Sequence, residues 1–571
     1  MKASSCLRFV ALRCIPTWVC LTLGLTSLGC GPKQPPKLPV PTVQPIEVPM
    51  PAAPPPSDAP LFAYLKVRDL TRTLGLFGGP AVLEPLAQAQ GVHLDEIAAG
   101  KPLSLFLWDP DRVDTPFALP LVGLFPVPAQ GTLARRLTSM NESLQAEAWG
   151  EQTGIAMNGR ALEQARAQKD TLLGIANAPT PFDALLYLHI DAVLSKYAPV
   201  LRQGIRAMQP LLTMSALRQP GSPSPASTMA MFEGMVSSLE SLRAAAVGVR
   251  PYEGGIELSA LVQEKQSKAG EKGPLAAPNL VQFLPAGDIK LVWNSRDIQR
   301  IVDFYMRLYG PMLDEQPQLR ALVQSMVDDW LKIGRKLETA ASLSIGGDAV
   351  FRAYGLMRVD NPAAMLALGH KMVGMMQQGP LHDAYLQLGV NLQVAVKQGA
   401  RKVQGWPVDR YEYKVNLTPT AQNSPAKPVW EKLNRMGYEV AQIGPYLVYT
   451  FNAPVEEVVK ELFKGPVANR PGLQALAAYP AGGSFYADVN FSSLLKGVAS
   501  LVPAEAAARM PSLPPESGSL LLFGYDGGDV GYYKARLPMT LILALKSLGE
   551  SLRFPTPPIG GPRSLPGAPP N

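Results

Sequence analysis

Alternating apolar and polar positions predict two strand-and-hairpin units that follow each other along the chain. Residues 61–70 alternate as a strand that runs into a helix, and residues 289–298 repeat that pattern. An apolar hairpin follows each of them, over residues 103–125 in the first unit and 343–359 in the second. The second hairpin ends at Asp360-Asn361-Pro362, where a polar N-cap and a proline near the first helical position predict that a helix begins.

Two further landmarks repeat in the same order. The stretch 171–179 resembles 446–454, and both end in Asn-Ala-Pro, so we expect a short β segment in each unit. The apolar segments 185–191 and 484–490 come next, and each ends in a polar residue that predicts a helix cap.

A hairpin with a glycine turn closes each unit, over residues 247–262 and 520–537. Gly-Gly and Asp-Gly pairs supply the positive φ angles that two-residue hairpin turns require. Five landmarks in the same order indicate an internal duplication.

This order of elements predicts an α+β fold with two tandem related lobes. Hairpins outnumber the possible parallel crossovers, so we expect mainly antiparallel sheets with helices packed on one face and the other face free. Over about residues 60–550 the pattern is similar to uncharacterised secreted bacterial proteins built of two such lobes. That resemblance implies no catalytic residues.

Proline-rich and charged stretches predict where the lobes begin and end. Residues 31–59 are proline-rich and predict an extended tether, and the proline-rich end predicts a disordered tail. The stretch 264–274 is charged and poor in apolar residues, so we expect an exposed linker. The predicted segments are a leader at 1–29, the tether at 30–59, a first lobe at 60–265, a linker at 266–284, a second lobe at 285–550 and the tail at 551–571.

The amino-terminal thirty residues contain all four cysteines of the chain. Three basic residues and no acidic one precede a short apolar region over 14–28, which is typical of a cleaved signal peptide. The end of that region, Ser27-Leu28-Gly29-Cys30, resembles the lipobox of bacterial lipoproteins, with Gly29 in its place and Ser27 where an aliphatic residue is preferred. The resemblance implies cleavage before Cys30 and lipid attachment to its thiol; the alternative is ordinary secretion with an unused thiol.

Composition narrows the possible partners of the body. The chain has 53 Lys and Arg against 46 Asp and Glu, and three of the cations, Lys2, Arg8 and Arg13, lie in the leader. The body is therefore almost balanced in charge and has no basic stripe for nucleic acid. Without cysteines the body cannot depend on disulfides, and the 47% of apolar residues suffices for a packed core.

Motifs for catalysis or metal binding are absent from the sequence. Gly100-Lys101-Pro102 lacks the hydroxyl residue of a phosphate-binding loop, and there is no nucleophile elbow and no His-Glu-x-x-His helix. The histidines are scattered at His93, His189, His370 and His382. His189 on the strand that runs to Asp191 is the one we retain as a conceivable ligand or catalytic residue, although an isolated histidine in a strand is usually structural.

Two acidic turns are candidate cation sites. Asp109-Pro110-Asp111-Arg112-Val113-Asp114 offers three carboxylates but lacks the glycine and the distal glutamate of a calcium loop. Asp526-Gly527-Gly528-Asp529 has the composition of a hairpin turn. We interpret both as turns, and the sequence predicts no metal and no cofactor.

Two clusters of methionine predict either an apolar binding surface or core packing. Flexible thioethers suit surfaces that take varied apolar partners, whereas methionines at helical spacing are more often core residues. A loop at 220–225 interrupts the first cluster and would act as a lid in the first interpretation. The clusters are Met208, Met214, Met229, Met231 and Met235, and Met365, Met372, Met375 and Met376.

These observations favour a lipid-anchored envelope protein, not an enzyme, that serves as a binding or scaffolding module. We expect membrane attachment through the lipid on Cys30, on the outer membrane because Gly31 and not aspartate follows it. The partner would be an envelope protein or an apolar ligand, and no nucleic acid. Two alternatives stay open: a periplasmic carrier of an apolar ligand such as a lipid, and an unrecognised hydrolase.

Replacing Cys30 by alanine tests the anchor, because this thiol is the only one that cleavage of the leader would leave. We expect the Cys30→Ala variant to leave the detergent phase and appear in the aqueous phase on detergent partitioning. A variant that still sorts with the membrane fraction would contradict lipid attachment at this residue.

Overall fold

The computed structural model describes most of residues 61–543. The longest stretches outside the description are 1–50, 74–101, 110–119, 212–224, 266–276, 418–435, 465–483 and 544–571. The leader with Cys30, the tail, and the tether apart from Pro51 lie outside the described residues. Among the helices that are described, none is long and apolar enough to cross a membrane.

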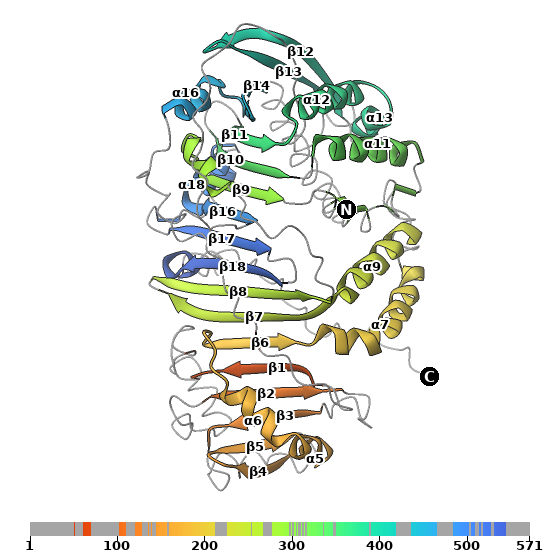
Figure 1. The fold of residues 1–571 in the computed structure, drawn as a ribbon, viewed down its shortest axis with the longest axis vertical. Coiled ribbons are helices and arrows are strands. Elements are labelled where there is room, and N and C mark those ends of the chain that lie inside the picture. Colours follow the sequence, from red (N-terminus) through yellow and green to blue (C-terminus); the bar gives the residue numbers. More distant parts are fainter. Residues whose placement is uncertain are drawn as a thin grey trace, which may run out of the picture.

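The described residues form strands and helices that alternate along the chain (Figure 1). The strands are β1 (Leu61–Val67), β2 (Leu103–Trp108), β3 (Leu121–Phe125), β4 (Gln145–Trp149), β5 (Gln152–Ala156), β6 (Ala184–Leu188), β7 (Leu242–Tyr252), β8 (Gly255–Glu264), β9 (Ile289–Ser295), β10 (Leu337–Ile345), β11 (Phe351–Val359), β12 (Val390–Val403), β13 (Trp406–Leu417), β14 (Gly437–Ile443), β15 (Tyr446–Phe451), β16 (Phe485–Asn490), β17 (Ser519–Asp526) and β18 (Val530–Pro538). The helices are α5 (Gly159–Ala167), α6 (Lys169–Asn177), α7 (Ile190–Ala207), α9 (Pro225–Glu240), η3 (Ala277–Phe283), α11 (Pro317–Ile333), α12 (Pro362–Gln377), α13 (Pro380–Gln387), α16 (Glu456–Lys464), α18 (Phe491–Ala499) and α19 (Ala504–Ala507).

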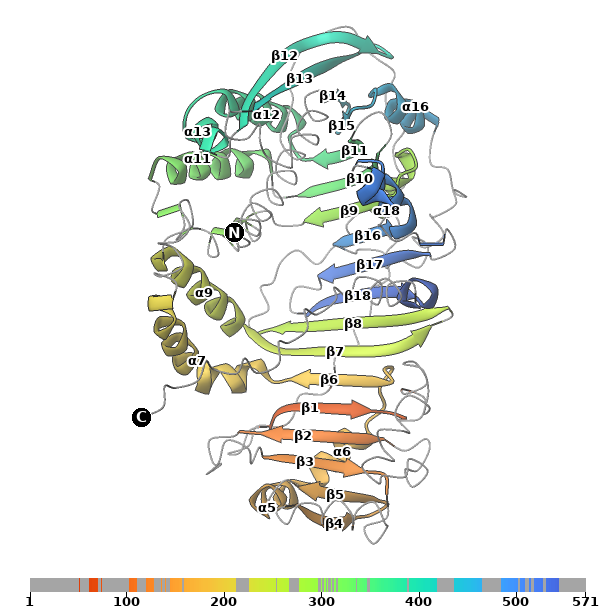
Figure 2. The ribbon, with the colours of Figure 1, turned by 180° about the vertical axis from the view of Figure 1, so that it is seen from behind.

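All described strands belong to one antiparallel sheet, so the predicted α+β class and antiparallel pairing are confirmed. The strands stack along the longest axis of the molecule, from β4 at one end to β12 at the other (Figures 1 and 2). Their order is β4-β5-β3-β2-β1-β6-β7-β8-β18-β17-β16-β9-β10-β11-β15-β14-β13-β12. The two halves of the chain thus share a single sheet and do not form separate ones.

Strands that correspond in the two halves of the chain follow each other in the same order, counted from each half towards the middle of the sheet. From β5 inwards it is β5-β3-β2-β1-β6-β7-β8, and from β15 inwards it is β15-β11-β10-β9-β16-β17-β18. The first strands of the two units, at 61–67 and 289–295, therefore occupy corresponding positions. The long hairpin of β12 and β13 has no counterpart among the described strands of the first half.

One predicted landmark is wrong. Residues 171–179 were expected to form a β segment like 446–454, but they lie in helix α6 and its C-terminal end, whereas 446–451 is strand β15. The counterpart of β15 is β5, which pairs with β3 as β15 pairs with β11. A short apolar run fits a buried helix as well as a strand, and here the helix buries Leu172 and Ala176.

The structure confirms the predicted helix caps Asn361 and Asn490 but not Asp191. Asn361 caps α12 by accepting a hydrogen bond from the Ala364 amide at 3.0 Å, and Asn490 caps α18 by accepting one from the Ser493 amide at 3.0 Å. Asp191 is not a cap, since α7 begins at Ile190 and its N-cap residue, His189, makes no side-chain capping bond.

One face of the sheet, which we call the covered face, carries two hydrophobic cores side by side. In the first half, α5 and α6 pack over it, and Tyr64 stacks on Tyr187 with ring centroids 4.9 Å apart. In the second half, η3 and α16 cover the same side of the strands, around Val292, Leu356 and Val448. At the β12 end, α11 and α12 pack on the opposite face of the sheet. They cover Met357 and Tyr449, which are the sequence neighbours of Leu356 and Val448 and point to the other side.

A buried lysine ties α6 to the covered face. Lys66 on β1 is 4% exposed and donates hydrogen bonds to the carbonyl oxygens of Ile175, at 3.1 Å, and Ala178. These carbonyls lie at the C-terminal end of α6, where the helix dipole favours a cation. Burial lowers the pKa of Lys66 to about 8.

A buried carboxylate stabilises the pairing at the middle of the sheet. Glu257 on β8 has a fully buried side chain and accepts hydrogen bonds from Arg250 on β7, at 2.6 Å, and Arg536 on β18, at 2.8 Å. Lys534, also on β18, lies 3.3 Å from the same carboxylate. Burial alone raises the pKa of Glu257, but these hydrogen bonds and cations together hold the pKa below its usual value.

Replacing Glu257 by glutamine leaves three cations around a neutral group, so we expect a destabilisation of about 3–5 kcal/mol at pH 7. Because folding lowers the pKa of Glu257, its stabilising effect is complete above the unfolded-state pKa and disappears as pH falls through the folded-state pKa. The difference in stability between the wild type and the Glu257→Gln variant should therefore be smaller in acid. Midpoints of urea unfolding for both proteins at pH 7 and pH 3 measure this difference.

The matched control is Glu412→Gln, since Glu412 is also paired with cations but is 41% exposed. We expect this substitution to cost less than about 1 kcal/mol at either pH. Equal effects of the two substitutions would contradict the role of Glu257 in stabilising the pairing of β8 with β7 and β18.

Candidate functional site

The three described histidines, His189, His370 and His382, lie on different elements. His189 is the N-cap residue of α7, and its amide donates to the Phe62 carbonyl at 2.8 Å. The His370 Nε2 lies 3.6 Å from the Asp409 carboxylate. The His382 Nδ1 is 3.2 Å from the Met376 carbonyl oxygen. His93 lies outside the described residues.

Asp191, the residue paired with His189 in the sequence, makes structural contacts. Its carboxylate lies 2.6 Å from Lys265 and accepts a hydrogen bond from the Ser195 hydroxyl at 3.2 Å. The hydrogen bond from Lys265 lowers the pKa of Asp191. A carboxylate held ionised by a lysine at a helix start is suited to anchoring the helix more than to accepting a proton.

The first acidic turn is also engaged with α7. Asp109 pairs with Lys196 and accepts a hydrogen bond from the Tyr197 hydroxyl at 3.2 Å. Asp111, Asp114 and the glycines of the second turn lie outside the described residues, as do Gly100 and Lys101. The described part of the chain contains no group of three or more His, Cys, Asp or Glu that could hold a metal ion.

The two methionine clusters differ in their surroundings. Met365, Met372 and Met376 are buried in the core between α12 and the sheet, as the packing interpretation predicts. Met208 at the end of α7 and Met235 on α9 are 39% and 46% exposed. Among the described methionines of the two clusters, Met208 and Met235 of the first are the exposed ones.

The largest unexplained surface is the face of the central strands opposite the covered face, which we call the open face. It spans the seven strands β6, β7, β8, β18, β17, β16 and β9, and Figure 2 views the sheet from this side, with α6 behind the strands. None of the side chains along its middle is charged. These residues are Leu186, Leu188, Ala245, Val247, Val249, Leu258, Ala260, Val262, Gly531, Tyr533, Ala535, Leu520, Leu522, Gly524, Phe485, Ala487, Val489, Ile289, Leu291 and Trp293.

Large apolar side chains on the open face are solvent-exposed. Leu186, Leu188, Val247, Leu258, Leu291 and Tyr533 are between 37% and 48% exposed. Their neighbours on the covered face, Tyr187 and Leu261, are 1% and 0% exposed. On these strands, large apolar side chains are exposed on the open face and buried on the covered face, where Glu257, Lys534 and Arg536 form a charged network among them.

The size of the open face is that of a functional surface. Strand spacing of about 4.8 Å and a rise of about 3.4 Å per residue give roughly 30 Å by 15 Å, or about 450 Å². The largest apolar patch on an ordinary monomer is about 300–600 Å² and is often functional. An apolar surface of this extent, free of charge, has the character of an interface centre.

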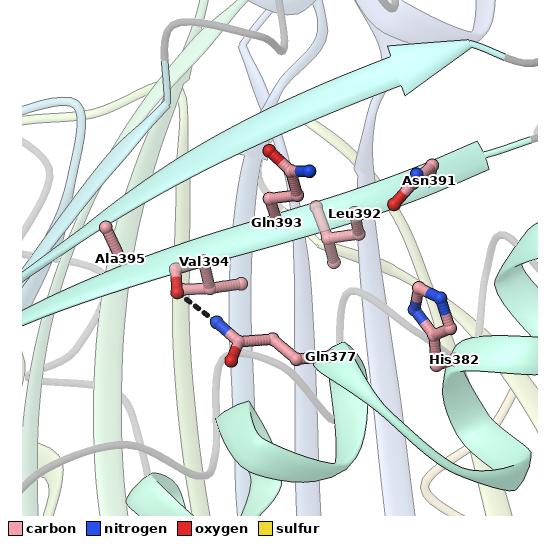
Figure 3. A pocket seen from close by; sticks show the side chains of 7 residues that line it. All are labelled: Gln377, His382, Asn391, Leu392, Gln393, Val394 and Ala395. Carbon is pink, nitrogen blue, oxygen red and sulfur yellow. Dashed lines mark hydrogen bonds between the residues drawn. The ribbon is translucent and has the colours of Figure 1, made fainter.

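A second, smaller feature is a hollow beside the terminal strand β12. It has a volume of about 430 Å³ and is lined by Gln377, His382 and residues 391–395 (Figure 3). Its lining is mixed polar and apolar. Sequence reasoning missed it because it depends on the place of β12 at the end of the sheet.

Comparison with known proteins gives no family for this chain. Protein-family models, curated proteins and solved structures were all compared with it. None of the three gave a match. The functional argument therefore depends on the open face and the hollow themselves.

Proposed function

We propose that this protein is a non-catalytic, lipid-anchored scaffold of the cell envelope that binds a partner protein through the open face. The single observation that carries the proposal is an uncharged apolar face of about 450 Å² with exposed leucine, valine and tyrosine side chains. The lipid on Cys30 would hold the body at the outer membrane, and the proline-rich tether would set its distance from the bilayer.

The dimensions of the open face support a protein as the partner. A standard protein interface buries about 800 Å² on each side, with an apolar centre and a polar rim. The open face supplies more than half of that area. Exposed residues on α7 and α9, such as Val200, Met208, Met235 and Leu239, would extend it.

The placement of the candidate catalytic residues supports a binding role. His189, His370 and His382 lie on different elements, and Asp109 and Asp191 are each paired with a lysine. A catalytic site needs an acid or base within hydrogen-bond reach of a nucleophile and of a substrate position. These residues do not meet that condition with one another.

A carrier of an apolar ligand such as a lipid is the second candidate. The observation that favours it is the exposure of Met208 and Met235, because flexible thioethers accommodate varied apolar ligands. The burial of Met365, Met372 and Met376 counts against a ligand at the second cluster.

A photo-crosslinking amino acid at Tyr533, on the open face, tests the proposal in intact cells. We expect a discrete, saturable adduct with the mass of a protein, and we expect Leu258→Lys in the same chain to abolish it. The matched control carries the crosslinker at Glu163, which is exposed on α5 over the covered face.

An adduct with the mass of a lipid would support the carrier and contradict the scaffold. Equal adduct formation at Tyr533 and Glu163, or none at either residue, would contradict both functions.

A further inference from the structure

Strand β12 ends the sheet and offers an unpaired edge. It pairs with β13 along one side, and no described strand pairs with the other. The free side of an edge strand presents backbone N–H and C=O groups that another strand can bind.

The position of Gln377 shows which backbone groups face outward. Its side-chain amide donates a hydrogen bond to the Val394 carbonyl from the side opposite β13 (Figure 3). Alternate residues of a strand direct their backbone groups to the same side. The N–H and C=O groups of Leu392 and Val396 therefore also face away from β13.

The length of the usable edge is limited by a bulge. The pairing of β12 with β13 is regular from Val390 to Lys397 and then shifts before Arg401. Within the shift, Gly399 has a φ of 55° and its amide donates to Asp409 at 2.7 Å. The bulge turns the strand away from a straight ladder, so the edge accommodates a short segment.

The hollow lies along this edge. Five consecutive residues of β12, 391–395, form one wall, and Gln377 and His382 at the ends of α12 and α13 form the other (Figure 3). A cavity of about 430 Å³ in contact with an unpaired strand provides room for an added backbone.

We propose that the hollow beside β12 is a strand-addition site for an extended polypeptide segment that carries acidic side chains at alternate positions. This site is separate from the open face, and its partner binds through main-chain hydrogen bonds.

The charges beside the edge select the partner. On the solvent side of β12 and β13, Lys397, Arg410 and Lys414 are exposed and surround a single carboxylate, Glu412. The opposite side of β12 directs Leu392, Val394 and Val396 towards the core. An added strand would therefore place acidic residues directly beside Lys397, and one strand away from Arg410 and Lys414 on β13. It would place apolar residues on the helix side, where His382 and the exposed Asp383 of α13 are the nearby titratable groups.

Gln377 occupies part of the site in the free protein. Its amide takes the place that an incoming N–H would take at the Val394 carbonyl. Removing the amide opens that position, so the Gln377→Ala variant should bind a peptide more tightly than the wild type does.

Fluorescence anisotropy with the full chain and an eight-residue peptide of alternating Glu and Val tests the proposal. We expect Gln377→Ala to bind about threefold or more tighter, and Leu392→Pro, which removes an outward amide, to bind at least about tenfold more weakly. Lys397→Glu combined with Lys414→Glu should reduce affinity for this peptide and raise it for a Lys-Val peptide. Gln203→Ala, at an exposed position of α7 away from the hollow, is the control that should bind like the wild type.

A peptide with alternate amides N-methylated keeps the charge and removes the donors, and it should bind at least about tenfold more weakly even if Leu392→Pro does not fold. Equal binding of the methylated peptide, or no binding to Gln377→Ala at about 1 mM, would overturn the proposal. Concentration-dependent dimers that Leu392→Pro abolishes, without peptide binding, would assign the edge to a second copy of the chain and also overturn it.

Discussion

The pairing of β8 with β18 is the interaction on which the rest of the structure depends. It joins the two halves of the chain, and its register runs over nine residue pairs from Val530 opposite Gln263 to Pro538 opposite Gly255. Glu257 lies in this pairing and binds Arg250 on one side and Arg536 on the other. A buried carboxylate without these cations would be costly, so the charge network favours the register in which β18 carries Lys534 and Arg536 beside β8.

Joining the halves in one sheet has a consequence for both faces. The covered face becomes a continuous row of packed residues, from Leu185 through Phe523 and Tyr486 to Val292. The same joint brings the opposite sides of seven strands together, and the result is the open face. Two separate sheets would each offer a smaller apolar surface, so the proposed binding role depends on the joint.

The sequence predicted local features well where the signal is local. The glycine-turn hairpins and the caps at Asn361 and Asn490 follow from residues that are neighbours in the chain. Residues 171–179 were assigned wrongly because a short apolar run has no period long enough to separate a strand from a helix. The duplicated pattern anticipated which strands correspond, but not that they share a sheet.

The candidate site could not be predicted from the sequence, because it depends on contacts between residues that are far apart in the chain. Ser259 and Tyr532, whose hydroxyls lie 3.4 Å apart across the joint, are 273 residues apart in the chain. Strands such as β6 and β17 are apolar on both sides, which ordinarily indicates burial on both faces. Only the arrangement of helices around the assembled sheet shows that one side of these strands stays exposed, and only the strand order places β12 at an edge.

A disulfide across the joint tests the central claim most directly, because the body has no cysteines of its own after residue 30. Ala260 and Tyr533 are directly opposite each other on β8 and β18, at a spacing that a disulfide can bridge with little adjustment. We predict that Ala260→Cys with Tyr533→Cys forms a disulfide on mild oxidation, seen as a gel shift that a reductant reverses. Val262→Cys with Tyr533→Cys, offset by two residues, should form far less. Equal cross-linking of both pairs, or none in the folded protein, would contradict a single sheet joined at β8 and β18.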